Sequence, residues 1–120
     1  MCRMVSYDGK TDVAEIKLPH IKNVVDQASR ANNISRIMLF GSALEERCTD
    51  RSDIDLAVFG SLPKAQYLRS KEFREFQDRV FLFDLGQDYD ILYFSDKKKN
   101  TDSILRDISR GAEIYRRDAS

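Results

Sequence analysis

The chain has 120 residues and a mass of 13.9 kDa, which suits one domain and leaves no room for two. It is 42% hydrophobic and 33% charged, a composition too apolar for a disordered chain. Twenty basic and twenty acidic residues give a formal net charge of zero, so no overall field draws the protein to nucleic acid or to an anionic membrane. A chain without net charge is poorly protected against self-association, which favours a partner protein or a homo-oligomer.

The sequence also lacks the usual marks of secretion and of metal binding by histidine. No apolar run approaches the roughly 20 residues that span a bilayer, and residues 1–10 are too polar for a signal peptide. We therefore expect a cytoplasmic protein. Cys2 and Cys48 lack C-x-x-C spacing, so we expect two reduced thiols without a function. His20 is the only histidine, which argues against a His-based zinc site or triad, and we expect it on the surface without a role.

Helical and strand-like segments alternate along the chain. Residues 1–17 show only weak periodicity and form an uncertain N-terminal extension of a single domain, 1–120. Short apolar runs predict strands, and segments with a 3.6-residue apolar repeat predict helices. In chain order we expect a helix at 19–32, strands at 34–40 and 54–59, a helix at 65–85, a strand at 89–94, a helix at 102–110 and a short strand at 113–116. This order predicts an α+β (α/β) domain: a small mixed β-sheet with flanking helices.

The expected helix at 65–85 has more apolar residues than one face can hold. Its core-facing stripe consists of Leu68, Phe73, Phe76, Val80 and Phe83. Three further apolar residues fall away from that stripe, namely Tyr67, Phe81 and Leu82. We expect these three to contact a second subunit or a helical partner. The alternative is that the segment bends and buries all of them.

Two acidic side chains stand next to each other at the start of the second strand. Asp53 and Asp55 project to the same face, because residues i and i+2 of a strand share a face, while Ile54 points into the core. Two carboxylates this close repel each other, and a divalent cation between them removes the repulsion. Mg²⁺ prefers such oxygen ligands. A third carboxylate on a neighbouring strand, Asp90, would complete a two-metal site for phosphoryl or nucleotidyl transfer.

A glycine and a serine precede this acidic pair. Gly41 follows a buried strand at a point where a side chain would block close approach of the backbone. Ser42 begins a turn or short helix whose free N–H groups, with the serine hydroxyl, can hold a phosphate. We therefore expect one loop to bind a triphosphate and the following strand to hold the metals.

Together these motifs resemble the minimal nucleotidyltransferases of the DNA polymerase beta superfamily. The resemblance runs roughly from Pro19 to Tyr115 and rests on four segments: Leu39-Phe40-Gly41-Ser42, Ser52-Asp53-Ile54-Asp55-Leu56, Tyr89-Asp90-Ile91-Leu92 and 108–115. It implies a nucleotidyltransferase fold that uses Mg²⁺ and a nucleoside triphosphate such as ATP. By position, Asp53, Asp55 and Asp90 would be the catalytic metal ligands, with Asp90 also the general base, and Gly41 and Ser42 would bind the nucleotide.

Two features leave alternatives open. Glu45 and Glu46 stand where many relatives carry basic, aromatic or small residues, which puts nucleotide affinity in question unless Arg47 or Arg51 compensates. The third acid could also be Asp84 or Asp88; Asp90 is preferred because it lies within an apolar strand.

The resemblance also implies a biological setting. Many such small proteins are antitoxins paired with a helical HEPN-type toxin, and some transfer AMP to a tyrosine of that toxin. We expect this activity here, since the chain is too short to carry its own acceptor-binding domain. The alternatives are an antitoxin that acts by binding alone, and nucleotidylation of a small molecule. Polymerisation of nucleic acid is the least favoured reading, because the composition offers no basic groove.

Overall fold

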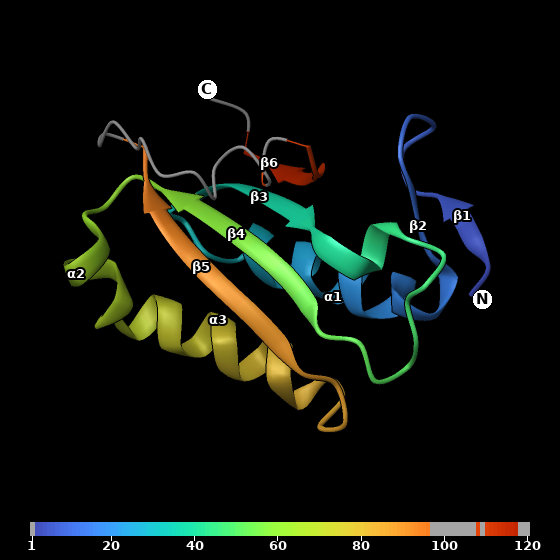
Figure 1. The fold of residues 1–120 in the computed structure, drawn as a ribbon. Helices are drawn as coiled ribbons and strands as arrows, with labels where there is room; N and C mark the ends of the chain where they lie inside the picture. The colour runs from blue at the N-terminus through green and yellow to red at the C-terminus, as the bar shows by residue number, and fades with distance from the viewer. Residues whose placement is uncertain (1, 97–107, 109, 118–120) are drawn as a thin grey trace.

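The structure, a computed structural model, describes residues 2–96, 108 and 110–117. The chain folds around a four-stranded sheet, with a two-stranded hairpin at one end (Figure 1). The elements are β1 (Met4–Ser6), β2 (Asp12–Ala14), the 3₁₀ helix η1 (Glu15–Lys17), α1 (Leu18–Ser29), β3 (Ile34–Phe40), the 3₁₀ helix η2 (Gly41–Leu44), β4 (Ile54–Gly60), α2 (Lys64–Leu68), α3 (Lys71–Leu82), β5 (Tyr89–Ser95) and β6 (Ala112–Arg116).

The large sheet has the strand order β5-β4-β3-β6 and is mixed. β3 pairs antiparallel with β4 and with β6, whereas β4 and β5 run parallel. Parallel strands need a crossover connection, and α2 and α3 supply it. The predicted α+β architecture with a small mixed sheet is thus confirmed. Most of the helix expected at 102–110 lies outside the described residues.

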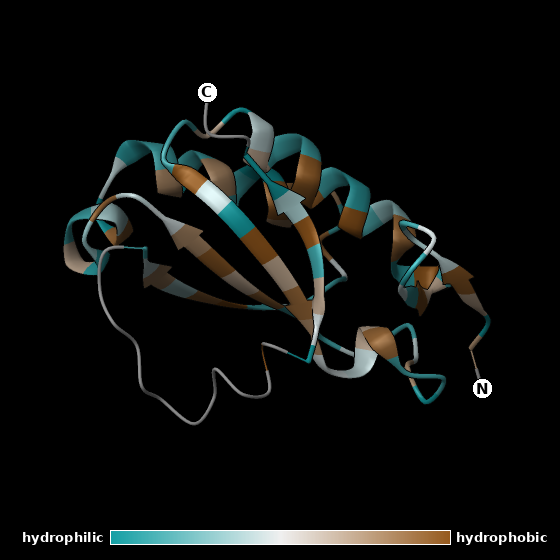
Figure 2. Ribbon diagram, turned by 90° about the horizontal axis from the view of Figure 1, so that it is seen from above, coloured by the Kyte–Doolittle hydropathy of each residue, from teal (hydrophilic) through white to brown (hydrophobic). Residues whose placement is uncertain are grey.

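The two faces of the sheet have different surroundings. On one face, the strand residues Ile37, Leu39, Ile54, Leu56 and Val58 pack against buried side chains of α1 and α3. The alternate residues point to the other face, where Met38, Ala57, Phe59 and Phe94 form a smaller cluster with Ile108. Figure 2 shows hydrophobic bands on the strands and on the helices beside them. The smaller face is the one to which Asp55 belongs, because it alternates with Leu56.

The segment 65–85 is two helices rather than one. α2 ends at Leu68, and Ser70 is the N-cap of α3, since its hydroxyl oxygen accepts a hydrogen bond from Phe73 N at 3.1 Å. This break rotates α2 so that Tyr67 is fully buried, and its hydroxyl donates to Glu72 Oε2 at 2.6 Å. The expectation that Tyr67 faces solvent is therefore wrong.

The same break changes the exposure of other apolar side chains. Leu68 and Phe83, expected in the core, are 43% and 50% exposed, because Leu68 lies on the rotated α2 and Phe83 follows the end of α3. Phe81 and Leu82 are exposed as expected. Phe73, Phe76 and Val80 form the buried stripe of α3, which confirms the predicted core-facing part of that helix.

The N-terminal segment, whose weak periodicity predicts no element, is an ordered hairpin of β1 and β2. At its turn, Asp8 Oδ1 accepts hydrogen bonds from Lys10 N and Thr11 N, both at 2.8 Å, and Gly9 has a φ of 82°. Val13 is fully buried in the main core. The hairpin therefore packs on the same core as the sheet.

α1 ends at Ser29, three residues before the end predicted for it. The chain turns there because the Glu72 carboxylate accepts from Asn32 N at 3.0 Å and Asn33 N at 3.1 Å, which pins the turn to α3. None of the helices in the described ranges is long and apolar enough to cross a bilayer.

Candidate active site

The carboxylate of Asp55 lies against the backbone of Gly41. Phe40 and Asp55 are paired across β3 and β4, so the chain leaves β3 directly beside Asp55. Gly41 turns into η2 with a φ of 79°, and a Cβ atom built on it would lie only 2.1 Å from Asp55 Oδ2. Glycine is required here for two reasons: the left-handed backbone and the missing side chain.

On its other side, Asp55 faces a second acid. Asp55 and Asp90 occupy matching positions in the parallel pair β4–β5, and Asp53 lies directly before β4. Partial burial raises the pKa of Asp55, and the negative charges of Asp90 and Asp53 raise it further. The three acids selected from the sequence are thus close enough to interact electrostatically, with Asp55 between the other two.

The three carboxylates are nevertheless not drawn together as metal ligands. Within the described ranges, no group of three or more His, Cys, Asp or Glu side chains is arranged to hold a metal ion. Mutual repulsion among three like charges favours their separation when no cation lies between them, and the convergence of all three carboxylates on a metal ion stays a prediction. The donor set itself, carboxylate oxygens, still fits a hard divalent cation.

A cleft of about 570 Å³ opens beside Asp55. It is lined by Phe40, Gly41, Leu44, Glu45, Arg47, Asp55, Arg110 and Gly111. Of the site residues predicted from the sequence, Gly41 and Asp55 line this cleft, whereas Ser42, Asp53 and Asp90 do not. Two arginines, Arg47 and Arg110, bring positive charge to the cleft wall, and guanidinium groups bind phosphate well.

The two glutamates that follow η2 have different positions. Glu45 lines the cleft, but its carboxylate is ion-paired and hydrogen-bonded to the Arg47 guanidinium. Glu46 is exposed and does not line the cleft. One of the two negative charges is therefore compensated locally by the arginine that the sequence offered as a candidate.

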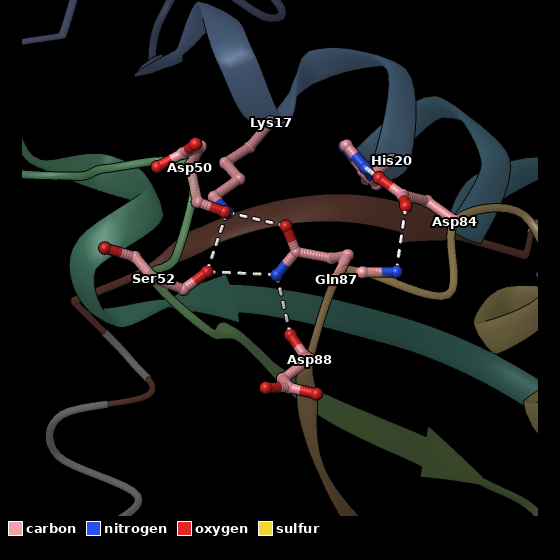
Figure 3. Close-up of polar contacts among 8 residues, drawn as sticks. Lys17, His20, Asp50, Ser52, Asp84, Gln87 and Asp88 are labelled. Atoms are coloured by element: carbon pink, nitrogen blue, oxygen red, sulfur yellow. Dashed lines mark hydrogen bonds and ion pairs between the residues drawn. The ribbon is translucent and has the colours of Figure 1, made fainter.

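A buried lysine, not recognised in the sequence, fixes the loops that lead to the acids. Lys17, only 1% exposed, donates from Nζ to Ser52 O at 2.7 Å, to Asp50 O at 3.3 Å and to Gln87 Oε1 at 2.6 Å (Figure 3). Gln87 Nε2 in turn donates to Ser52 O at 2.9 Å and to Asp88 O at 2.7 Å. Ser52 precedes Asp53, and Asp88 lies two residues before Asp90. The network therefore joins the start of β4 to the start of β5.

A second contact beside this network occupies one of the competing acids. His20 Nε2 lies 2.8 Å from Asp84 Oδ2, and the His20 side chain is only 13% exposed (Figure 3). The hydrogen bond from His20 is the main cause that lowers the pKa of Asp84, and Gly86 N adds to it. The expectation of a free surface histidine is therefore wrong, since packing against Phe83 and pairing with Asp84 hold the ring. Asp84 is engaged in this pair, which favours Asp90 as the third acid.

Comparison with known proteins gives one result. Residues 21–120 match the family described as "Polymerase beta, Nucleotidyltransferase". Curated proteins offer no match to the chain. The match includes Gly41, Asp53, Asp55 and Asp90 and leaves out the hairpin and Lys17.

The contact between Gly41 and Asp55 can be tested with a matched pair of variants. Gly9→Ala and Gly41→Ala both place an alanine at a positive φ, but only Gly41 has an atom in the way. We expect Gly9→Ala to lower the free energy of unfolding by about 1 kcal/mol. Gly41→Ala should lower it by about 3 kcal/mol or more, because Asp55 must also move. Urea denaturation followed by circular dichroism measures both, and equal losses would contradict the contact.

The Lys17 network predicts a stability loss on removal of the ammonium group. Lys17→Met keeps the apolar stem and removes the ammonium donor from the carbonyls of Asp50 and Ser52 and from the Gln87 amide oxygen; Ser52 O keeps only the hydrogen bond from Gln87 Nε2. We expect the free energy of unfolding to fall by about 3 kcal/mol. Lys22→Met, at an exposed position of α1, is the control and should change it by less than about 0.5 kcal/mol. Similar values for the two variants would contradict the role of the network.

The raised pKa of Asp55 predicts that replacing its carboxyl group by an amide increases the free energy of unfolding, by an amount that depends on pH. A carboxyl group whose pKa is higher in the folded than in the unfolded chain favours folding when protonated, and this contribution is lost as pH rises through the folded-state pKa. Asp55→Asn should therefore stabilise the protein at pH 7, and the gain should disappear below the ordinary value of 3.8. Asp78→Asn, on the exposed side of α3, controls for the change in net charge. Urea titrations across pH, in the presence of a chelator, measure the gain.

Proposed function

This chain belongs to the polymerase beta nucleotidyltransferase family, and we propose that it transfers AMP from ATP to the hydroxyl of a tyrosine on a helical partner protein. Nucleotidyltransferases of this family generally use a nucleoside triphosphate and a divalent metal ion. What we propose beyond family membership is the nucleotide (ATP), the acceptor group (a tyrosine hydroxyl) and the partner protein. The partner we propose is a HEPN-type toxin, for which this protein would be the antitoxin.

One observation carries the proposal: Asp55 lies between Gly41 and Asp90 at the wall of a cleft with two arginines. This arrangement supports the proposal that an acidic cluster lies beside a surface that binds phosphate. Burial, and after it the negative charges of Asp90 and Asp53, raise the pKa of Asp55, and a cation bound with a triphosphate would relieve the repulsion among the three carboxylates. The cleft of about 570 Å³ is in the size range of small-molecule sites.

The residues can be given roles in a nucleotidyl transfer. Asp53, Asp55 and Asp90 would hold Mg²⁺, which supplies charge neutralisation at the reacting phosphate. Gly41 and Ser42, at the start of η2, would approach the triphosphate with Arg47 and Arg110. Asp90 would accept the proton of the tyrosine hydroxyl. The hydroxyl oxygen then forms a bond to the α-phosphorus, and the bond from that phosphorus to the pyrophosphate oxygen breaks.

An exposed apolar surface at the end of α3 suits a partner chain. Phe81, Leu82, Phe83 and Leu85 are 37% to 79% exposed and form an apolar surface, the α3-end patch. A second cleft of about 270 Å³ lies there, lined by Phe81, Leu85, Gln87, Asp88 and Tyr89. Tyr89 begins β5, the strand that carries Asp90. Tyr89 packs on the side of the sheet that α3 covers, whereas Asp55 and Asp90 point to the other side. The patch therefore supports a partner chain through its exposed apolar area and not through closeness to the acids, and a second copy of this chain is the other occupant to test.

The transfer itself is tested by incorporation of label. The purified protein is mixed with the product of the neighbouring gene, Mg²⁺ and ATP labelled at the α-phosphate. We expect label on a tyrosine of the partner, abolished by a chelator. Asp53→Asn, Asp55→Asn and Asp90→Asn should each reduce the rate by about 100-fold or more, since each removes a charged ligand of the reacting centre. Asp78→Asn should leave the rate unchanged.

The outcomes separate the proposed activity from its alternatives. Undiminished labelling by the Asp53→Asn/Asp55→Asn double variant contradicts the catalytic assignment. A stable complex without label supports an antitoxin that acts by binding alone, and label on a small hydroxyl compound supports a small-molecule acceptor. Light scattering tests the α3-end patch: Leu82→Asp with Leu85→Asp should abolish the complex, whereas Leu68→Asp, at an exposed site of α2, should not.

A further inference from the structure

Cys2 and Cys48, far apart in the sequence, meet at one backbone carbonyl. Cys2 Sγ donates to Glu45 O at 3.5 Å, and Cys48 N donates to the same oxygen at 3.1 Å. Cys2 N also donates to Glu46 O at 2.9 Å. The two hydrogen bonds from Cys2 hold the segment before β1 against the loop that follows η2, beside the turn that contains Cys48.

The two thiols differ in access and lie beside the same turn. Cys48 is 2% exposed, whereas Cys2 is half-buried and reaches solvent. Burial raises the pKa of the Cys48 thiol, which donates to Thr49 O at 3.6 Å. The accessible thiol is therefore Cys2, and Cys48 lies within its reach as the second, protected thiol.

We propose that Cys2 and Cys48 are a redox modification site, at which a low-molecular-weight disulfide such as oxidised glutathione closes an intramolecular Cys2–Cys48 disulfide. The Cys2 thiolate attacks one sulfur of the oxidant, which forms a mixed disulfide and releases one glutathione thiolate. The Cys48 thiol then loses its proton and attacks Cys2 Sγ, which releases the second glutathione. Two protein thiols are oxidised, and one oxidant disulfide is reduced to two thiols.

The disulfide would fasten the N-terminal segment to a loop that forms part of the cleft. Glu45 and Arg47 lie in that loop and both line the cleft beside Asp55. The bond would link two segments that are already joined by two hydrogen bonds, from Cys2 Sγ and Cys2 N, so closing it requires little rearrangement of the chain. Oxidation would then restrain the Arg47 loop without any contact to the acids.

The test is exposure of the native full chain to oxidised glutathione, followed by alkylation of free thiols and mass spectrometry. We expect wild type to lose the mass of two hydrogen atoms, to resist alkylation at both cysteines, and to yield a peptide pair that joins Cys2 to Cys48. Reduction should restore both alkylation sites. The oxidised chain should also unfold at a higher temperature than the reduced chain, since the bond restrains the unfolded state.

Two single variants give the order of events. Cys48→Ser should stop at a glutathione adduct on Cys2, because the second thiol is missing. Cys2→Ser should remain free of adduct, because Cys48 is buried. Neither variant should show the mass loss or the rise in unfolding temperature. Two alkylatable thiols in treated wild type, adducts on both cysteines, or only disulfide-linked dimers would overturn the proposal.

Discussion

A buried ammonium group is the constraint on which the geometry of this molecule depends. An ammonium group taken out of water costs several kcal/mol unless acceptors surround it. Lys17 finds three, and all are uncharged: two main-chain carbonyls and the amide oxygen of Gln87. The carbonyls belong to the loop before β4, and Gln87 belongs to the loop before β5. The Lys17 ammonium group therefore sets the distance between the loop before β4 and the loop before β5. The pairing of the two strands alone would not fix that distance.

The charge of the cleft depends on pairs rather than on single residues. Glu45, read by itself, would repel a phosphate group; paired with Arg47, it leaves little net charge and holds the guanidinium in place. The guanidinium of Arg110 lines the same cleft from the segment before β6. The sequence names these side chains but does not show which of them are in contact. Their pairing decides whether the electrostatic potential in the cleft is positive or negative.

Features carried by short-range patterns were predictable from the sequence. The continuous apolar runs that became β3, β4 and β5 are visible in it, as are the glycine at the end of β3 and the alternation that puts Asp53 and Asp55 opposite Ile54. The hairpin had a readable signal as well, since Asp8-Gly9 lies between Val5 and Val13, and this dipeptide is typical of tight turns. That signal was missed because each strand is only three residues long.

Other features could not be read from local patterns because they depend on tertiary contacts. The periodicity of 65–85 fits one helix, and only the Ser70 cap and the Tyr67–Glu72 hydrogen bond divide it. Lys17 resembles a surface lysine until its three acceptors are assembled around it. The proximity of Cys2 to Cys48 likewise appears only when the hairpin has docked. In each case the residue that determines the local structure is distant in the sequence or is a helix cap. The apolar repeat shows neither.

The alternation along β4 has a consequence for folding itself. Side chains repeat every two residues in a strand, so a slip of one residue against β3 would turn Asp55 toward α1 and α3 and expose Leu56 in exchange. An unpaired carboxylate in that core costs several kcal/mol, more than most single apolar contacts return. The acids at the site therefore also select the register of the central strand. The cost of burying the Asp55 carboxylate penalises the misaligned pairing, and the correct register is the one that leaves Asp55 beside the open cleft.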